Sequence, residues 1–256
     1  ILPGPPPRMR GRFRAGAFGL ALALWVTAIP LHGACQRFPV ALDIGHSLSR
    51  PGAISARGRP EFAFNRELAS RLRDALVAGG FQAVLINPDG ADLGLAERGR
   101  VAAAGGAQLL LSIHHDSVQP HYLSRWMVDG QTRRYSDRFR GYSVFVSREN
   151  PAPDASERFA RLLGAHLLAA GFTPTLHHAE PIPGESRPLL DEATGVYRFD
   201  ELGVLRRAPM PAVLLEAGVI VHREEERKLR DPAYRDRLVA AIVAAIMAFC
   251  RLPGQD

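Results

Sequence analysis

The sequence predicts a single α/β domain built on a mostly parallel, twisted sheet with helices on both faces. From Phe38 onward, short apolar runs alternate with segments of helical period, and this order is typical of βαβ units. One run, Leu109–Ile113, is apolar throughout, as expected of a strand buried on both faces of a parallel sheet. The chain has 256 residues, of which 46% are hydrophobic and 23% charged, enough for one such domain with a buried core.

The first half of the domain is expected to alternate between strands and helices. In order, we expect a strand over Phe38–Ile44, a helix over Phe62–Ala78, a strand over Phe81–Ile86, a helix over Leu95–Ala104 and the apolar strand over Leu109–Ile113. The first helix has one apolar stripe at a spacing of three to four residues. Gly-Gly pairs end both helices, and an Asn-Pro-Asp-Gly turn ends the second strand.

The second half continues the alternation but contains two long irregular stretches. Its expected elements are a strand over Tyr142–Ser147, a helix over Asp154–Ala170, a strand over Ala212–Leu215, a helical region over Arg223–Leu229 and a long helix over Tyr234–Cys250. The irregular stretches are Ser117–Gly141 and Thr173–Ala208. Such stretches in a compact domain are either plain surface insertions or loops that cover a substrate site.

Residues 1–34 have the layout of upstream residues followed by a secretory signal peptide. A basic region around Met9 precedes the apolar stretch Ala15–Ile29, and the small residues Gly33 and Ala34 follow it. The apolar stretch is shorter than the roughly 20 residues that span a bilayer. We therefore expect export to the periplasm or cell envelope, with no stable membrane span once the signal is removed. The alternatives are a retained anchor and, at Cys35, a lipid attachment.

Charge and cysteine content narrow the function classes. The net charge is +6, yet Lys228 is the only lysine, and no run of arginines is interleaved with aromatic residues. We therefore expect no binding to nucleic acid, although attraction to an anionic cell-wall polymer fits the charge. The two cysteines, Cys35 and Cys250, form no Cys-x-x-Cys motif. After export they either form a disulfide or remain apart, and the sequence leaves this open.

Chemically suited side chains stand at the ends of three predicted strands. His46 follows the first strand, His114 follows the third, and Glu216 follows Ala212–Leu215. In an open α/β sheet, ligands gather at the carboxyl ends of the strands. A fourth residue, Glu61, lies where the loop after the first strand becomes a helix. Two imidazoles and one carboxylate form a catalytic zinc site, and the remaining carboxylate is then free to act as a base.

Each of these residues also has a plain structural interpretation. A single histidine such as His46 more often makes ordinary hydrogen bonds, and Glu61 suits the first turn of any helix. Adjacent strand residues point to opposite sides, so only one of His114 and His115 can face a given metal ion. Glu216 is the least ordinary, because a carboxylate after an apolar strand is costly unless it is paired, metal-bound or solvated.

The order of short motifs resembles that of the zinc-dependent N-acetylmuramoyl-L-alanine amidases of the Amidase_3 family. The resemblance runs from about Phe38 to Cys250, and the amidase domain is placed at residues 38–252. The matching motifs are Asp-Ile-Gly-His46, Glu61-x-x-x-Asn65, Ala96-Glu97-Arg98, Leu-Ser-Ile-His114-His-Asp116 and Pro-Ala-Val-Leu-Leu-Glu216-Ala-Gly. The chain departs from the family's usual pattern at Gln108, His115 and Val219. These departures leave the implied metal ligands intact, but the family's substrate preference and regulation do not carry over to this chain from the resemblance.

The resemblance implies one Zn²⁺ per chain, bound by His46, Glu61 and His114, with Glu216 as the catalytic carboxylate. The implied reaction is hydrolysis of the amide between N-acetylmuramic acid and L-alanine in peptidoglycan. The implied partners are peptidoglycan and a candidate activator protein, and we expect a monomer.

Four further residues are candidates for supporting roles. Asp43 and Asp116 are candidates for orienting a ligand imidazole. Arg98 is a candidate for a structural ion pair or a substrate contact. His178, in the second irregular stretch, either lines the cleft or belongs to a surface loop. Two other functions stay open at this point, namely a zinc peptidase that cuts peptidoglycan stem peptides and an inactive wall-binding module.

Overall fold

The computed structural model describes residues 1–2, 4 and 35–252. The chain divides into two units, Ile1–Leu31 and His32–Asp256, and the described helices and strands all lie in the second. The predicted signal, from its basic region to its small-residue exit, lies outside the described residues. Within the described ranges, no helix is both long and apolar enough to cross a membrane.

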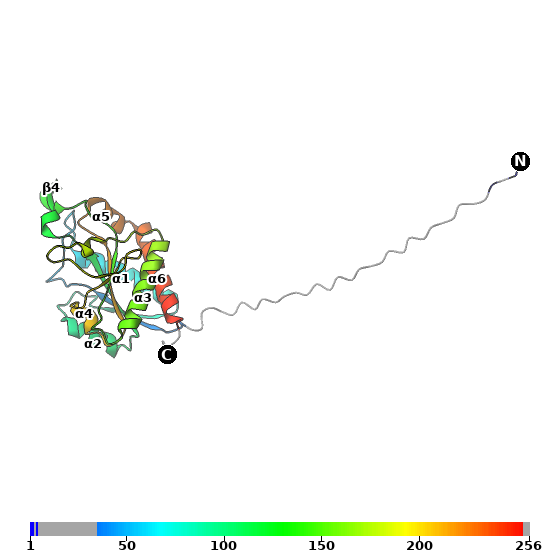
Figure 1. Cartoon of the computed structure of the whole chain (residues 1–256), viewed down its shortest axis with the longest axis horizontal. Helices are drawn as coiled ribbons and strands as arrows, with labels where there is room; N and C mark the ends of the chain where they lie inside the picture. The colour runs from blue at the N-terminus through cyan, green and yellow to red at the C-terminus, as the bar shows by residue number, and fades with distance from the viewer. Residues whose placement is uncertain (3, 5–34, 253–256) are drawn as a thin grey trace. The chain divides into compact units, whose positions relative to one another are not determined.

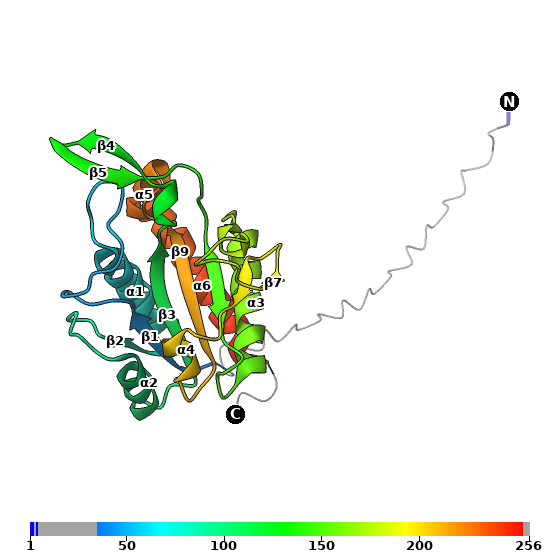
Figure 2. The same cartoon turned by 60° about the vertical axis from the view of Figure 1, so that its left-hand side comes forward.

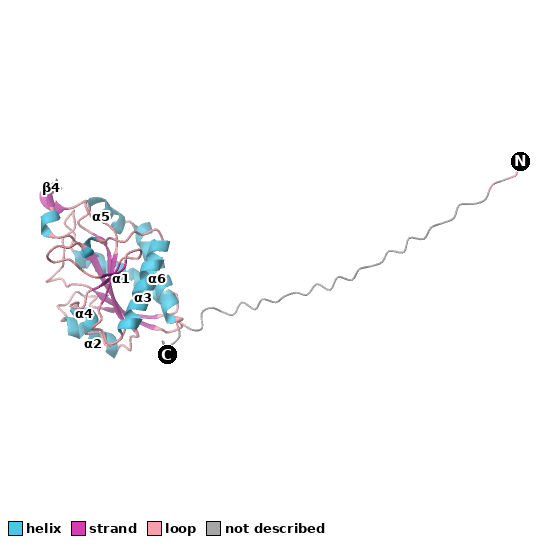
Figure 3. Cartoon of the chain, in the orientation of Figure 1, coloured by secondary structure: helices cyan, strands magenta, loops and turns pink. Residues whose placement is uncertain are grey.

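A seven-stranded mixed sheet forms the centre of the domain, with its strands in the order β2-β1-β3-β9-β6-β8-β7 (Figures 2 and 3). The strands are β1 (Pro39–Ile44), β2 (Gln82–Ile86), β3 (Leu109–Asp116), β6 (Ser143–Val146), β7 (Leu189–Asp191), β8 (Val196–Arg198) and β9 (Ala212–Val219). The pairs β1-β2, β1-β3, β3-β9 and β6-β8 are parallel. The pairs β6-β9 and β7-β8 are antiparallel. The prediction of a mostly parallel sheet is confirmed.

Helices cover both faces of this sheet, as predicted. The larger apolar core packs one face against α1 (Glu61–Ala78), α3 (Pro153–Ala169) and α6 (Pro232–Cys250). A smaller core packs the opposite face against α2 (Leu95–Ala104) and α4 (Gly203–Arg206). Figure 1 shows α3 and α6 side by side. A further helix, α5 (Arg223–Arg230), follows β9, and two short 3-10 turns, η1 (Pro120–Tyr122) and η2 (His177–Ala179), lie in the irregular stretches.

Hydrophobic period explains why the predicted elements form where they do. In α1, the apolar stripe at Phe64, Leu68, Leu72 and Leu76 is buried. In β3, Leu109, Leu110 and Leu111 are fully buried, as expected for a central strand with helices on both sides. The predicted boundaries differ from the observed ones by at most two residues, except that β3 and β9 continue three and four residues further.

The irregular stretches contain elements that the sequence pattern did not predict. In the first, β4 (Ser124–Val128) and β5 (Gln131–Tyr135) form an antiparallel hairpin, which projects beside α5 in Figure 2. The Trp126 indole nitrogen anchors the hairpin by donating to the Ala56 carbonyl oxygen at 2.9 Å. The second stretch contributes β7, β8, η2 and α4. Each of these strands is five residues or shorter, too short for a clear hydrophobic pattern.

A disulfide joins Cys35, ahead of β1, to Cys250, at the end of α6. Of the two alternatives that the sequence left open, the structure has the bonded one. Phe38 packs edge-on against Phe249 beside it, with ring centroids 6.3 Å apart. The bond therefore ties the start of the first strand to the end of the last helix.

Candidate metal centre

Three of the predicted residues meet at the carboxyl edge of the sheet. The neighbours β1 and β3 are parallel and in register at Ile44 and Ile113, so His46 and His114 emerge at the same edge. Glu61, the first residue of α1, reaches between them. Its Oε2 lies 3.0 Å from His46 Nε2 and its Oε1 lies 3.1 Å from His114 Nδ1. One ligand atom from each residue falls within 4.8 Å of the others.

Two glycines leave room for these side chains. At Gly45, a Cβ would overlap the His114 ring, reaching 2.6 Å from its Cδ2. At Gly52, whose φ is +76°, a Cβ would overlap the Glu61 carboxylate and the His46 ring. Neither requirement could be identified from the sequence pattern. The turn itself is made by His46, which has a φ of +69°, so Gly45 is needed for space rather than for its backbone conformation.

Hydrogen bonds hold the Glu61 carboxylate in place. Asn65, one turn further along α1, donates to Glu61 Oε1 at 3.2 Å, and the Ala53 amide donates to Oε2 at 3.0 Å. Burial opposes ionisation of Glu61, but hydrogen bonds from His114 and His46 outweigh it and keep the Glu61 pKa well below its usual range. The Glu61 carboxylate is thus ionised and held between the two histidine rings, as a metal ligand must be.

His115 points away from the cluster, as alternation along a strand requires. Its Nδ1 lies 2.8 Å from Asn65 Oδ1, and its ring packs against Phe64. Burial lowers the His115 pKa to about 3, so the ring is neutral. Of the two adjacent histidines, only His114 turns its ring toward Glu61, whereas His115 donates its backbone amide to Glu61 Oε1 at 3.3 Å.

Asp43 and Arg98 form a buried ion pair beneath His46. Arg98 Nη1 donates to Asp43 Oδ1 and to the Ile44 carbonyl, both at 2.6 Å, and Nη2 donates to the His46 carbonyl at 2.7 Å. Asp43 also accepts from the Ser112 hydroxyl at 2.7 Å. The hydrogen bonds of the Asp43 carboxylate among the described residues thus go to Arg98 and Ser112. Arg98 fixes the backbone that carries His46.

Glu216 lies in β9 directly opposite His114 in the register of β3 and β9. Its Oε2 is buried and has no hydrogen-bond partner among the described residues. Burial, together with the negative charges of Asp116 and Glu61, raises the Glu216 pKa well above the usual value. An orphaned carboxylate oxygen next to a His-Glu-His cluster is ready to accept a proton or to face a cation.

The donor set fits a zinc-type ion. Two imidazole nitrogens and one carboxylate oxygen are the ligands of many catalytic zinc sites, which keep a further position open. The unpartnered Glu216 Oε2 beside this donor set is a polar atom that the protein's own hydrogen bonds leave unexplained. A cation bound by the cluster would provide a favourable electrostatic interaction for the Glu216 carboxylate.

A second cluster occupies the space between β3 and η2. Asp116, at the end of β3, contacts His178 Nε2 through its Oδ2 at 2.8 Å, and His177 Nε2 lies 3.3 Å from the same oxygen. His178 Nδ1 lies 2.9 Å from Glu185 Oε2. Burial opposes protonation of His178, but Asp116 and Glu185 outweigh it and raise the His178 pKa to about 9. Among the described residues, Asp116 thus contacts the two histidines of η2, and His178 contacts Asp116 and Glu185.

The sequence pattern offered His177 and His178 together as a candidate lining of the cleft, but it did not group them with Asp116, and Glu185 was missed. The one available signal was the His-His pair in a polar stretch with an acidic residue seven or eight positions on. That signal did not indicate burial, yet the His177 side chain is only 1% exposed. The second irregular stretch is therefore partly buried beside Glu216.

Two hollows flank the metal cluster and Glu216. One of about 300 Å³ is lined by His46 and His114 together with Arg50 and Leu95. The other, of about 180 Å³, is lined by Glu216 with His178 and Arg187 of the second irregular stretch. None of the hairpin residues of β4 and β5 lines either hollow, whereas the second irregular stretch contributes to both.

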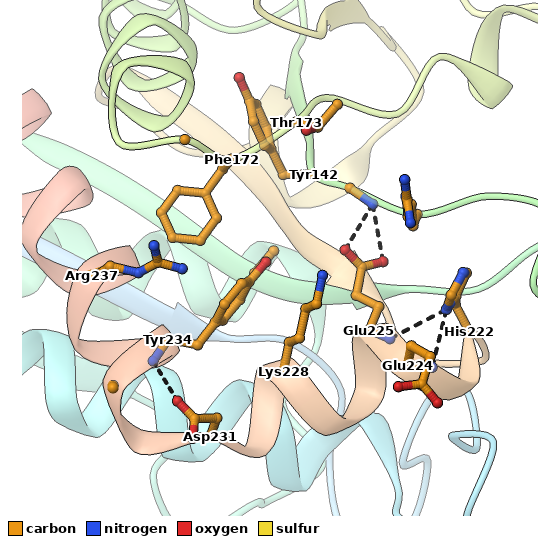
Figure 4. Close-up of a pocket in the computed structure, with 15 residues that line it drawn as sticks. Tyr142, Phe172, Thr173, His222, Glu224, Glu225, Lys228, Asp231, Tyr234 and Arg237 are labelled. Carbon is orange, nitrogen blue, oxygen red and sulfur yellow. Dashed lines mark hydrogen bonds between the residues drawn. The ribbon is translucent and has the colours of Figure 1, made fainter.

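A third hollow, of about 490 Å³, lies apart from these residues, between α5, the start of α6 and the turn after α3 (Figure 4). Glu225 forms its inner wall and accepts backbone hydrogen bonds from Gly141 and Val219. Burial raises the Glu225 pKa to about 7. Lys228 and Tyr234 also line this hollow (Figure 4). None of the four predicted site residues lines this hollow.

Comparison with known proteins assigns the family. The sequence profile of the N-acetylmuramoyl-L-alanine amidase family, Amidase_3, matches residues 40–248. The chain belongs to this family. The predicted family and the α/β fold are confirmed.

Individual relatives agree with this assignment. The probable N-acetylmuramoyl-L-alanine amidase AmiB of Haemophilus influenzae is 28% identical over 239 residues, which cover 82% of this chain and 51% of that protein. The N-acetylmuramoyl-L-alanine amidase AmiA of Escherichia coli is 26% identical over 222 residues, covering 82% of this chain and 75% of that protein. The chain thus spans about half the length of the AmiB relative.

The fold also matches a solved amidase. The catalytic domain of CwlV, an N-acetylmuramoyl-L-alanine amidase from Bacillus (Paenibacillus) polymyxa var. colistinus, superposes with a TM-score of 0.62 at 25% identity. The match covers 82% of this chain and 96% of that domain.

Proposed function

We propose that this protein is a zinc-dependent amidase that hydrolyses the amide bond between N-acetylmuramic acid and L-alanine in peptidoglycan. The observation that carries the proposal is the convergence of His46, Glu61 and His114 beside the unpartnered oxygen of Glu216. Membership of the amidase family supports the choice of substrate.

His46, Glu61 and His114 would hold the zinc ion, and Arg98 and Asn65 would keep two of these ligands in position. Zinc bound there would polarise the scissile carbonyl and lower the pKa of a coordinated water to roughly 7. The prearranged, charged Glu61 carboxylate suits this role because it needs no proton loss on binding.

Glu216 would act as the general base and then as the general acid. Its buried Oε2 would take a proton from the attacking water and pass it to the amine of the leaving L-alanine. Burial raises the proton affinity of this carboxylate, which favours both accepting the proton and holding it until the amine departs.

The hollows on either side of the cluster suit an extended substrate. The first, walled by Arg50 and Leu95, and the second, walled by Phe145 and Arg187, leave room on both sides of a bond placed at the metal. A polymer with a sugar on one side of the scissile amide and a peptide on the other would use both.

The deciding experiment is mass spectrometry of the products formed from intact sacculi by the zinc-loaded protein. An amidase releases peptides with a free L-alanine amino terminus and leaves the glycan intact. New termini within the stem peptide would instead identify a peptidase. Absence of any product, with zinc bound, would favour a wall-binding module.

Glu216→Gln tests the role of the carboxylate. We expect unchanged zinc content and a fall in kcat of about 10²- to 10⁴-fold, the range for losing a general base. Glu149→Gln is a suitable control, because the Glu149 side chain is 56% exposed and pairs with Arg206 at the surface. Normal turnover by the Glu216 variant would exclude it as the base.

A further inference from the structure

We propose that Asp116, His177 and His178 form a second binding site for a divalent transition-metal ion, separate from His46, Glu61 and His114. The three side chains come from different parts of the chain, since Asp116 ends β3 and the two histidines begin η2. One ligand atom from each lies within 4.8 Å of the others.

The spacing of the donor atoms suits one shared ion. Both histidines direct Nε2 at a single carboxylate oxygen, Asp116 Oδ2, at 2.8 Å for His178 and 3.3 Å for His177. The corresponding spacings at the first cluster are 3.0 and 3.1 Å. Tetrahedral ligands that each lie about 2.0–2.2 Å from a zinc ion are separated from one another by about 3.4 Å, close to the spacings in both clusters.

The outer atoms of all three residues are held by other groups. His177 Nδ1 lies 2.8 Å from the Thr175 hydroxyl, and His178 Nδ1 lies 2.9 Å from Glu185 Oε2. Asp116 Oδ1 accepts from the Ser117 amide at 2.7 Å. Metal-binding histidines nearly always donate the N–H of their second ring nitrogen to a neighbouring acceptor. With the Nδ1–H tautomer on both rings, Thr175 and Glu185 would be those acceptors and both Nε2 atoms would be free for the ion.

His177 supplies a second and independent observation. Its side chain is 1% exposed, and its Nε2 is buried without a hydrogen-bond partner among the described residues, although it faces Asp116. An ion pair between His178 and Asp116 alone leaves this nitrogen unsatisfied, at a cost typical of an unpaired buried polar group. A cation shared by the two rings and Asp116 satisfies it.

The donor set selects the kind of ion. Two imidazole nitrogens and one carboxylate favour zinc and its neighbours over calcium or magnesium, which prefer oxygen ligands. An ion there would attach the start of η2 to the end of β3, next to Glu216. It would thereby fix the wall of the smaller hollow, to which His178 and Glu185 contribute.

Metal content of the purified full-length protein tests the site. The protein is stripped with a chelator, reloaded with Zn²⁺, desalted and analysed for zinc by mass spectrometry. We expect two zinc ions per chain for the unchanged protein and one for His177→Ala. His114→Ala should also bind one, and the double variant none. His166→Ala, a histidine change on α3 outside both clusters, should still bind two.

Cobalt substitution keeps the test decisive if a variant fails to fold. The unchanged protein titrated with Co²⁺ should show two successive visible absorption changes, each saturating at one equivalent. A single equivalent of zinc and of cobalt in the unchanged protein would overturn the second site and leave the proposed function standing. The reverse failure is also distinct: if His114→Ala binds as much zinc as the unchanged protein, the first cluster is not a zinc site.

Discussion

Replacing Gly45 by alanine should weaken zinc binding at the first cluster without changing any of the three proposed ligand residues. The added Cβ would lie 2.6 Å from His114 Cδ2 and would overlap the rest of the ring edge. Carbon atoms pack at about 3.5 Å or more, so the ring must retreat by about 1 Å. A metal site tolerates only about 0.2 Å of change in its ligand distances. His114 therefore cannot keep its bond to an ion held by His46 and Glu61.

The expected loss of affinity is large. Changes that merely disturb the support of a ligand cost about 10- to 100-fold in metal binding. Displacing the ligand itself should reach at least the upper end, about 100-fold, or ~2.7 kcal/mol. Zinc affinity measured by competition with a chromophoric chelator gives this number directly, and release of dye from labelled peptidoglycan should fall with it.

Gly105→Ala is the matched control. Gly105 also has a φ in the ordinary range, at −78°, and the nearest atom to its added Cβ would be 3.5 Å away. This variant should bind zinc like the unchanged protein. If the Gly45 variant keeps a dissociation constant within about threefold of that value, His114 does not bind the ion.

Three further predictions concern stability. Glu225 has a pKa of about 7 in the folded protein, against 4.5 for a free carboxyl, so the folded state binds this proton more tightly than the unfolded state. The unfolding free energy should therefore be highest at low pH and fall by about 3 kcal/mol between about pH 4.5 and 7. Glu225→Gln should flatten this decline in urea unfolding across that range, and an unchanged slope would contradict it. Cys250→Ser opens a disulfide that spans 215 positions from Cys35, and should lower the unfolding free energy by about 5 kcal/mol in the loop-entropy account; equal urea midpoints for the variant and the oxidised protein would contradict this. Arg98→Met leaves Asp43 buried and unpaired and should cost about 3–5 kcal/mol, with partial recovery when Asp43→Asn is added; a double variant less stable than the single one would refute the pairing.

The parts of the fold that could be predicted from the sequence are those whose pattern is long and regular. The helix over Leu95–Ala104 has the predicted limits, and the four-residue stripe of α1 placed Glu61 at a helix start. The convergence of His46 and His114 could be expected because parallel strands share a carboxyl edge. These inferences need only local period and one topological rule.

The remainder depends on contacts between distant segments. Nothing local in the sequence indicates that Arg98 would bind the His46 carbonyl, or that Gly45 would be needed for the His114 ring. To predict the contact between Asp116 and His178, one must know the path of a loop more than 60 positions further along the chain. An irregular loop has no hydrophobic periodicity from which its path could be predicted. For the same reason, the sequence around Trp126 predicts only an irregular stretch, although it forms a hairpin.

The bond between Cys35 and Cys250 has a consequence for how the enzyme can be displayed. Both ends of the domain leave it at one corner, beside the start of β1, whereas the cleft opens at the opposite, carboxyl edge of that strand. A surface, bead or fusion partner attached through either end of the domain would therefore be joined to the side opposite the cleft. The proposed site at the carboxyl edge of the sheet would then remain accessible to a polymeric substrate.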